Sequence, residues 1–253
     1  MKRIIVSLSL IFISNVVFGW GQTGHRTVAR VAENHLSKKA RKKLFEIMGH
    51  ESLVEASTWM DNIKSDSTYD YAKTWHYVTV PDGKTYQSAE KSETGDAYEA
   101  INRLRSVVKN ENSTIIQKQE AIRMLVHIIG DFHQPLHVGN GTDRGGNQVK
   151  IKWFSTKSNL HRIWDSGIIE RKGFSYSELA ELIDHPTEQA NLNSTDLDVW
   201  VAEAQALRPQ IYASSDQDRL SYEYMYKNWD TLKDQLLKGG IRLAAVLNEI
   251  LED

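Results

Sequence analysis

The chain has 253 residues, of which 25% are charged and 40% hydrophobic, with a formal net charge of -2 and no cysteine. The near-neutral charge excludes a protein that holds nucleic acid through a broad basic surface, because such binding draws its affinity from neutralised phosphates. It leaves room for an enzyme that engages one or two phosphates locally. The lack of cysteine excludes disulfide bonds and thiolate-held structural zinc.

The N-terminal segment has the pattern of a secretory signal. Two basic residues follow the initiator methionine, an apolar run then reaches Phe18, and Gly19 is a small residue of the kind that signal peptidases prefer. The apolar run is short for a membrane span, and no later segment resembles one. We therefore predict a signal over 1–19, cleavage after Gly19, and export of residues 20–253 to the periplasm or the medium, without a membrane anchor.

Helical periodicity dominates the mature chain, with no repeat and no linker. It predicts helices over 23–36, 37–49, 53–63, 95–110, 113–132, 196–212 and 220–251, the last broken at Gly239 and Gly240. Alternating patterns predict short strands over 74–80 and 148–154, the second after a glycine-rich turn. The predicted fold class is all-α, a single mostly helical domain with a short β-hairpin.

Two pairs of histidine and aspartate carry the strongest chemical signal. His127 and Asp131, like His161 and Asp165, stand four residues apart, so each pair lies on one face of a helix. Imidazole nitrogen and carboxylate oxygen are ligand types that suit zinc. His133 stands two residues beyond Asp131 and faces away from it, so we interpret it as a structural or supporting residue.

Further ligands are needed, because two such pairs cannot fill several coordination shells. The candidates are Asp61 at the polar edge of its helix, His76, and His25 near the mature N-terminus. Pro135 is expected to end the preceding helix and to turn His137 toward the same centre. A lone histidine is usually a surface or hydrogen-bonded core residue, but the joint pattern favours a metal centre.

Seven segments of the mature chain carry a family resemblance. They are Trp20-Gly-x-x-Gly-His25, Trp59-Met-Asp61, Trp75-His76-Tyr77, His127-x-x-Gly-Asp131-x-His-Gln-Pro-Leu-His137, Gly145-Gly-Asn147, Asn159-Leu-His161-x-x-Trp-Asp165 and Gly240-Ile-Arg-Leu-Ala-x-x-Leu-Asn248. In order and spacing they resemble the zinc-dependent, single-strand-preferring nucleases of fungi, plants and bacteria, the S-one/P-one family. That family is related in fold to bacterial zinc phospholipase C.

The resemblance implies three zinc ions (Zn2+) per chain, and each expected ligand type is present. The implied ligands are Asp61, His76, His127 and Asp131 for the first ion, Asp131, His25 and Trp20 for the second, and His137, His161 and Asp165 for the third. Asp131 thus bridges two ions. Trp20 contributes its carbonyl and its free α-amine, which exists only after cleavage behind Gly19.

The implied reaction is hydrolysis of phosphodiester bonds in single-stranded DNA and RNA to 5′-nucleotides, with 3′-nucleotidase activity from the same geometry. Zinc lowers the pKa of bound water from about 15.7 to near 7 and neutralises charge on the departing oxygen. The family pattern makes Lys64 and Asn147 phosphate-facing residues, and with Asp131 they form the predicted catalytic set.

Two positions bear on base recognition. Tyr77 matches the aromatic platform of the family, on which a base stacks with about 1 to 3 kcal/mol. Thr79 stands where fungal members carry an acid that hydrogen-bonds the base. This departure leaves the base preference open, as it does the choice between RNA and DNA.

Two other functions share the predicted ligands. A phospholipase C would use nearly the same zinc set on a lipid phosphodiester, and an exported zinc-binding protein would hold metal without turnover. Tyr77 and the Gly-Gly-Asn turn favour the nuclease, whereas Lys64 and Asn147 beside the metals argue against simple storage. We expect the enzyme to act as a monomer, with nucleic acid as substrate and no stable protein partner.

Overall fold

The computed structural model describes residues 19–185 and 192–252. Apart from Gly19, the predicted signal lies outside the described residues. The helices are α1 Gln22–His35, α2 Lys38–Met48, α3 Leu53–Ala56, α4 Trp59–Asn62, α5 Ala97–Lys109, α6 Ile115–Phe132, α7 Leu160–Arg162, α8 Ile168–Lys172, α9 Tyr176–Ile183, α10 Leu197–Tyr212 and α11 Tyr222–Glu252, with 3-10 turns η1 Ile63–Ser65, η2 Ser67–Ala72, η3 Tyr86–Ser88 and η4 Pro135–His137, and the π-helical η5 Ile163–Gly167. The predicted mostly helical class is confirmed.

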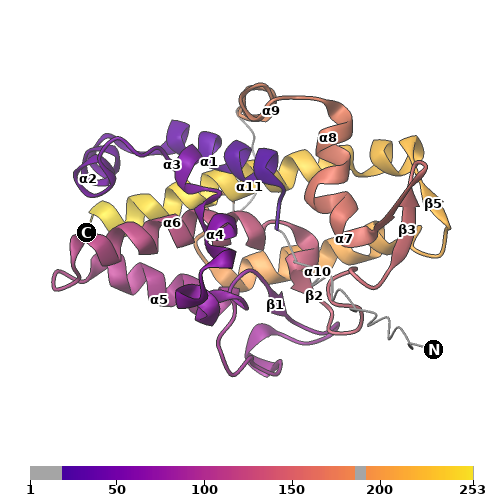
Figure 1. Cartoon of the computed structure of the whole chain (residues 1–253), viewed down its shortest axis with the longest axis horizontal. Coiled ribbons are helices and arrows are strands. Elements are labelled where there is room, and N and C mark those ends of the chain that lie inside the picture. Colours follow the sequence, from indigo (N-terminus) through magenta and orange to yellow (C-terminus); the bar gives the residue numbers. More distant parts are fainter. Residues whose placement is uncertain (1–18, 186–191, 253) are drawn as a thin grey trace, which may run out of the picture.

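Helix α6 forms the centre of the molecule. A capping box between Thr114 and Gln117 begins the helix, and from Ala121 to Phe132 nearly every residue is buried, whichever way it points. A helix that is buried on all sides must be surrounded, and α6 packs against α1, α5 and α11. Figure 1 shows α6 and α11 running lengthwise through the molecule, with α5 beside α6.

The predicted break at Gly239 and Gly240 is wrong, because α11 continues through both residues to Glu252. A Cβ atom on Gly240 would lie 2.5 Å from the Cβ of Val31 and 2.9 Å from the carbonyl oxygen of Val28. The glycines therefore let α11 approach α1 closely. The packing gained there outweighs the helix cost of glycine, about 1 kcal/mol per residue.

The strands form two small sheets. β3 Lys150–Trp153 and β4 Thr156–Asn159 form the predicted antiparallel hairpin, and β5 Arg219–Leu220 pairs with β3 in parallel. The segment predicted over 74–80 contains only β1 Val78–Thr79, which pairs in parallel with β2 Val138–Gly139. This second sheet joins two segments that each follow a predicted metal ligand.

Two further differences concern helix boundaries. The helix predicted over 53–63 is split into α3 and α4, because the chain turns at Ser57, whose hydroxyl donates to the carbonyl of Val54. The helical turn expected at His161 and Asp165 is formed by α7 and η5, whereas helices α8 and α9 were not predicted; side-chain caps from Asn159 and Ser175 begin α7 and α9. Among the helices in the described part of the chain, none is long and apolar enough to cross a membrane.

Candidate metal centre

The centre is built around the buried carboxylate of Asp131 on α6. Its Oδ2 atom lies 2.8 Å from Nδ1 of His76 and 3.2 Å from Nε2 of His127, one helical turn earlier. Its Oδ1 atom lies 3.2 Å from Nε2 of His25 and 3.9 Å from Nδ1 of His137. The two oxygens therefore face different groups of histidines.

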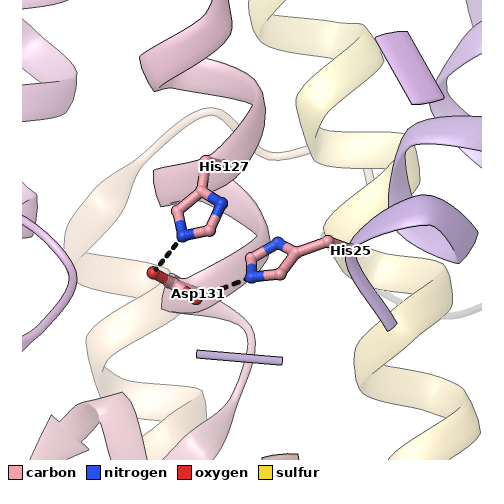
Figure 2. Close-up of side chains that lie close together, drawn as sticks. All are labelled: His25, His127 and Asp131. Carbon is pink, nitrogen blue, oxygen red and sulfur yellow. Dashed lines mark ion pairs between the residues drawn. The ribbon is translucent and has the colours of Figure 1, made fainter. Parts of the chain in front are cut away.

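His25 reaches Asp131 from the start of α1. Figure 2 shows its ring and that of His127 on two sides of the carboxylate, and the two rings stack with centroids 3.9 Å apart. The ring of His25 lies over Gly130, where a Cβ atom would be 2.9 Å from Nδ1. A glycine in the middle of a buried helix is thus explained by the close approach of this histidine.

A second group joins Asp61 on α4, His76 in the turn before β1, and His127. The Nε2 atom of His127 lies 3.1 Å from Nδ1 of His76 and 3.7 Å from Oδ1 of Asp61. On the solvent side, the ammonium of Lys64 donates to the same Asp61 oxygen at 2.5 Å. Lys64, predicted to face a phosphate, therefore stands at the rim of this group.

The third group consists of His137, His161 and Asp165. Helix α6 ends before Pro135 as predicted, and His137 at the end of η4 lies 3.9 Å from Oδ1 of Asp165 through its Nε2 atom. The Nε2 atom of His161 lies 3.4 Å from the other Asp165 oxygen. Asp165 sits on the π-helical turn η5, a distortion often found at functional sites.

Main-chain carbonyls orient three of the rings. The Nδ1 atoms of His127, His137 and His161 donate to the carbonyls of Ser57, His76 and Gly145 at 2.8, 2.5 and 2.6 Å. A carbonyl only accepts, so each ring carries its proton on Nδ1 and presents the Nε2 lone pair to the centre. This is the usual arrangement of metal-binding histidines.

Burial and neighbouring charges shift the pKa values of the ligand side chains in different directions. Burial opposes protonation of His127, but the carboxylates beside it, Asp131 foremost, raise the pKa of its ring. Burial lowers the pKa of His25, and it brings that of His76 to about 4, so both rings are neutral at neutral pH. Burial opposes ionisation of Asp131, but the surrounding histidines, His127 foremost, hold the pKa of its carboxyl well below the usual range. Burial raises the pKa of Asp165 well above its usual range, so this carboxylate needs a nearby cation.

In the part of the chain that the structure describes, several buried nitrogen and oxygen atoms of the centre have no hydrogen-bond partner, as expected of side chains available to a metal ion. Among the described residues, the buried Nε2 atoms of His25 and His137 and Oδ1 of Asp131 lack a hydrogen-bond partner. Three groups of His and Asp side chains could hold a metal ion: His25, His127 and Asp131; Asp61, His76 and His127; and His137, His161 and Asp165. The ligand atoms paired above within these groups lie 3.1–3.9 Å apart, near the roughly 3.3 Å between ligands of a tetrahedral ion with 2.0–2.1 Å bonds.

The start of the described chain reaches the same centre. Trp20 is fully buried, and the amide of Gly21 donates to the carbonyl of Asp165 at 2.7 Å. A Cβ atom on Gly19 would lie 1.4 Å from Oδ1 of Asp131, so the main chain directly before Trp20 touches the carboxylate. The main chain of Trp20, which is predicted to supply ligands, therefore lies next to the carboxylate of Asp131.

A cavity of about 240 Å³ opens beside the third group. It is lined by Tyr77, Val78, Thr79, Leu136, His137, Gly139, Gly141, Arg144, Gly145 and His161. Tyr77 is 38% exposed, so its ring is available for stacking, and Thr79 lies two residues further along the wall. Asn147 lies outside this lining, and its amide donates to the carbonyl of Arg144 at 3.0 Å.

Two residues of the site were not predicted. Gln134 is fully buried, and its amide donates to Oδ1 of Asp165 at 2.6 Å. Arg144 lines the cavity with a left-handed backbone (φ 57°), which is unusual outside glycine. The available signals were their positions in the sequence, because Gln134 lies in the His-Gln-Pro motif and Arg144 directly precedes the two glycines. Only the neighbouring residues were given a role.

Sequence comparisons agree with this geometry. A family model described as S1/P1 Nuclease matches residues 20–252. Endonuclease 4 of Arabidopsis thaliana is 32% identical, over 98% of this chain and 93% of that protein. Nuclease S1 of Aspergillus oryzae is 27% identical, over 99% and 98%, and Nuclease P1 of Penicillium citrinum is 26% identical, over 91% and 97%. The chain therefore belongs to the S1/P1 nuclease family, and the predicted class of enzyme, a phosphodiester hydrolase, is confirmed.

Proposed function

We propose that the chain is a zinc-dependent endonuclease that hydrolyses single-stranded DNA and RNA to 5′-nucleotides and also acts on 3′-nucleotides. The observation that carries the proposal is the position of Asp131, whose two oxygens face separate groups of ligands. A carboxylate shared in this way suits two nearby metal ions, the arrangement used in many phosphodiester hydrolases. The third group lies beside a cavity that has an exposed aromatic ring.

The proposed zinc ligands are the nine positions expected from the sequence. The first ion takes Asp61, His76, His127 and Asp131, the second takes Asp131, His25 and the amine and carbonyl of Trp20, and the third takes His137, His161 and Asp165. The donor set contains neutral imidazoles and carboxylates, as zinc prefers. We further infer that residues 1–19 are a secretory signal, since the amine of Trp20 becomes free only after cleavage, and that the product is exported.

When bound, zinc supplies Lewis acidity, lowering the pKa of water and neutralising charge on phosphate oxygens. The chain's own residues then orient the substrate. Lys64, held at the rim by Asp61, provides a cation that stabilises the phosphate as its charge changes. For Asn147 to face the same phosphate, its amide must exchange the Arg144 carbonyl for the substrate.

The cavity is the proposed base site. Tyr77 forms a wall on which a base can stack, and stacking accepts any base because each has a π-face. A base inside a duplex is already stacked and paired, so this site favours single strands. Thr79 and Arg144 are the polar side chains that could contact base edges within the described lining, apart from the two histidines.

The test is nucleotide release from single-stranded DNA and RNA by the chain starting at Trp20, with zinc content measured on the same sample. Release with about three zinc ions per chain, abolished by chelation, is the expected result. Phosphatidylcholine hydrolysis is assayed in parallel. Lipid hydrolysis without nucleotide release would make the protein a phospholipase C, and bound zinc without either activity would make it a zinc-binding protein.

A further inference from the structure

We propose that Arg208, on α10, is a positioning residue that holds together the two chain segments, at β1 and β2, that line the base cavity. The inference rests on the proposed function, because it treats the cavity as the place where a nucleobase binds. Arg208 lies outside every predicted ligand and substrate position. Its side chain is only 6% exposed, and it lies behind the cavity and not in it.

The guanidinium of Arg208 joins two segments that are far apart in the sequence. Its Nη2 atom donates to the carbonyl of Val80 at 2.8 Å, and to those of Val138 and Gly139 at 2.6 and 3.0 Å. Its Nη1 atom donates to the carboxylate of Asp82 at 2.5 Å. One buried cation therefore ties the end of β1 to both residues of β2.

The sheet that Arg208 holds is too small to be stable alone. β1 and β2 have two residues each and pair in parallel, in the register Val78 with Val138 and Thr79 with Gly139. Parallel ladders are slightly weaker per residue than antiparallel ones, and even a longer isolated strand pair is marginal in water. The amide of Val80 adds one bond to the carbonyl of Gly139. Contacts from outside the sheet must therefore hold β1 and β2 in place, and the hydrogen bonds of Arg208 are contacts of this kind.

The two strands and the residues directly before them supply six of the ten residues that line the cavity. Tyr77, Val78 and Thr79 come from the β1 side, and Leu136, His137 and Gly139 come from the β2 side. β1 and β2 lie side by side in one sheet, so holding them together fixes the position of the Tyr77 segment relative to the segment of Leu136, His137 and Gly139. If Arg208 is removed, this relative position is no longer fixed from behind, and a stacked base loses a matched surface.

The proposed metal ligands next to these strands have independent support. His76 and His137 each precede a strand, but the ring of His137 donates directly to the carbonyl of His76 at 2.5 Å. Both rings also face the carboxylate of Asp131. Loss of Arg208 is therefore expected to weaken binding of the base more than it disturbs the metal centre. KM should consequently rise while kcat stays nearly constant.

Arginine is suited to this position and lysine is not. A planar guanidinium offers five N–H donors in fixed directions, whereas an ammonium is a compact point charge that cannot match three carbonyls and a carboxylate together. A buried cation is tolerated only where such acceptors surround it. Arg208→Lys should consequently fall between the wild type and Arg208→Met.

The test compares Arg208→Met and Arg208→Lys with a matched control, Arg105→Met. Arg105 is a partly buried arginine on α5 that donates to the carbonyl of Thr195 at 3.0 Å, and it is not part of the cavity lining. Steady-state kinetics are measured on a dinucleoside monophosphate and on analogues that lack either base. Zinc content, melting temperature and calorimetric binding of a 5′-nucleotide are measured on the same proteins.

The expected result is that Arg208→Met raises KM for the complete substrate about tenfold, the effect of losing roughly one charged hydrogen bond. In Arg208→Met, kcat, zinc content and the KM for the analogue that lacks the base bound in the cavity stay within about twofold of the wild type, and nucleotide binding weakens in parallel with KM. The control Arg105→Met changes only the melting temperature. Unchanged KM in Arg208→Met, or a loss of zinc and kcat at constant KM, would overturn the inference. If Arg208→Met does not fold, Arg208→Lys decides, and wild-type KM in that variant overturns it as well. A wild type that cleaves no nucleotide substrate would instead refute the proposed function.

Discussion

The Nε2 atom of His25 lies 3.2 Å from Oδ1 of Asp131, which joins the first helix of the described chain to the central helix α6. The other oxygen of the same carboxylate faces His76 and His127. Occupancy of the first and second proposed metal positions is therefore coupled through a single side chain.

Asp131→Asn is predicted to be the most damaging substitution of a single ligand. The amide removes one negative charge shared by two ions, so about two of the three zinc ions should be lost, and kcat should fall more than the roughly 100-fold caused by losing a supporting residue. Elemental analysis and initial rates on single-stranded DNA measure both effects. Asp184→Asn, at a carboxylate paired with His35, is the control. Wild-type zinc content and rate in Asp131→Asn would show that the carboxylate does not bridge.

A methionine retained before Trp20 is predicted to abolish binding of the second zinc ion and most activity. The extra residue blocks the α-amine. It occupies the position of Gly19, where a Cβ atom would lie 1.4 Å from Oδ1 of Asp131 and would clash with it. The comparison uses two preparations whose N-termini are established by mass spectrometry, one starting at Trp20 and one at the added methionine. Equal zinc content and equal rates in the two preparations would contradict the proposed chelate.

Gly130→Ala is predicted to destabilise the protein, although alanine normally stabilises a helix by about 1 kcal/mol relative to glycine. The new Cβ atom would lie 2.9 Å from Nδ1 of His25, so the histidine must move. Overpacking of this kind costs about 1–3 kcal/mol. Urea denaturation and zinc analysis should show lower stability and weaker binding of one ion, and a variant as stable as the wild type with full zinc would refute the packing argument.

His133 is predicted to make stability fall with decreasing pH. Burial, together with the charge of Arg242, lowers the pKa of His133 well below its usual range, whereas in the unfolded chain it is about 6.5. Below that pH the unfolded chain binds a proton that the folded chain excludes. The contribution of neutral His133 to the free energy of unfolding is therefore complete above pH 6.5 and is lost as the pH falls toward the folded pKa. His133→Gln should flatten the pH dependence by up to about 1.4 kcal/mol per pH unit, measured by urea denaturation at pH 7.5 and 5.5. Parallel curves would contradict this assignment.

The amphipathic helices were predictable because their apolar periodicity is strong, as in α1, α2 and α5. The errors have local causes. Gly239 and Gly240 were expected to break a helix, but the contact of α11 with Val31 requires small residues and not a break. Helices α8 and α9 are too short for periodicity to stand out, and of the two only α9 has a side-chain cap, from Ser175.

The members of the site were predictable from residue types and spacing, whereas their supports were not. A spacing of four brings His127 to Asp131 on one helix, but no spacing indicates that a carbonyl of Ser57 orients the ring of His127. The contact of Gln134 with Asp165 likewise joins residues 31 positions apart through tertiary structure alone. Arg208 belongs to the same class, since its acceptors are main-chain carbonyls that any sequence would offer.

The two helical pairs differ from the remaining ligands in when they can form. His127 with Asp131, and His161 with Asp165, need only one or two turns of local helix, which forms within microseconds. His25, Asp61 and the N-terminus must close loops of tens of residues before they arrive, and such closure is slower. In the proposed zinc enzyme, we expect each pair to bind a zinc ion before the distant ligands arrive. The remaining ligands would then close around a metal ion that is already bound.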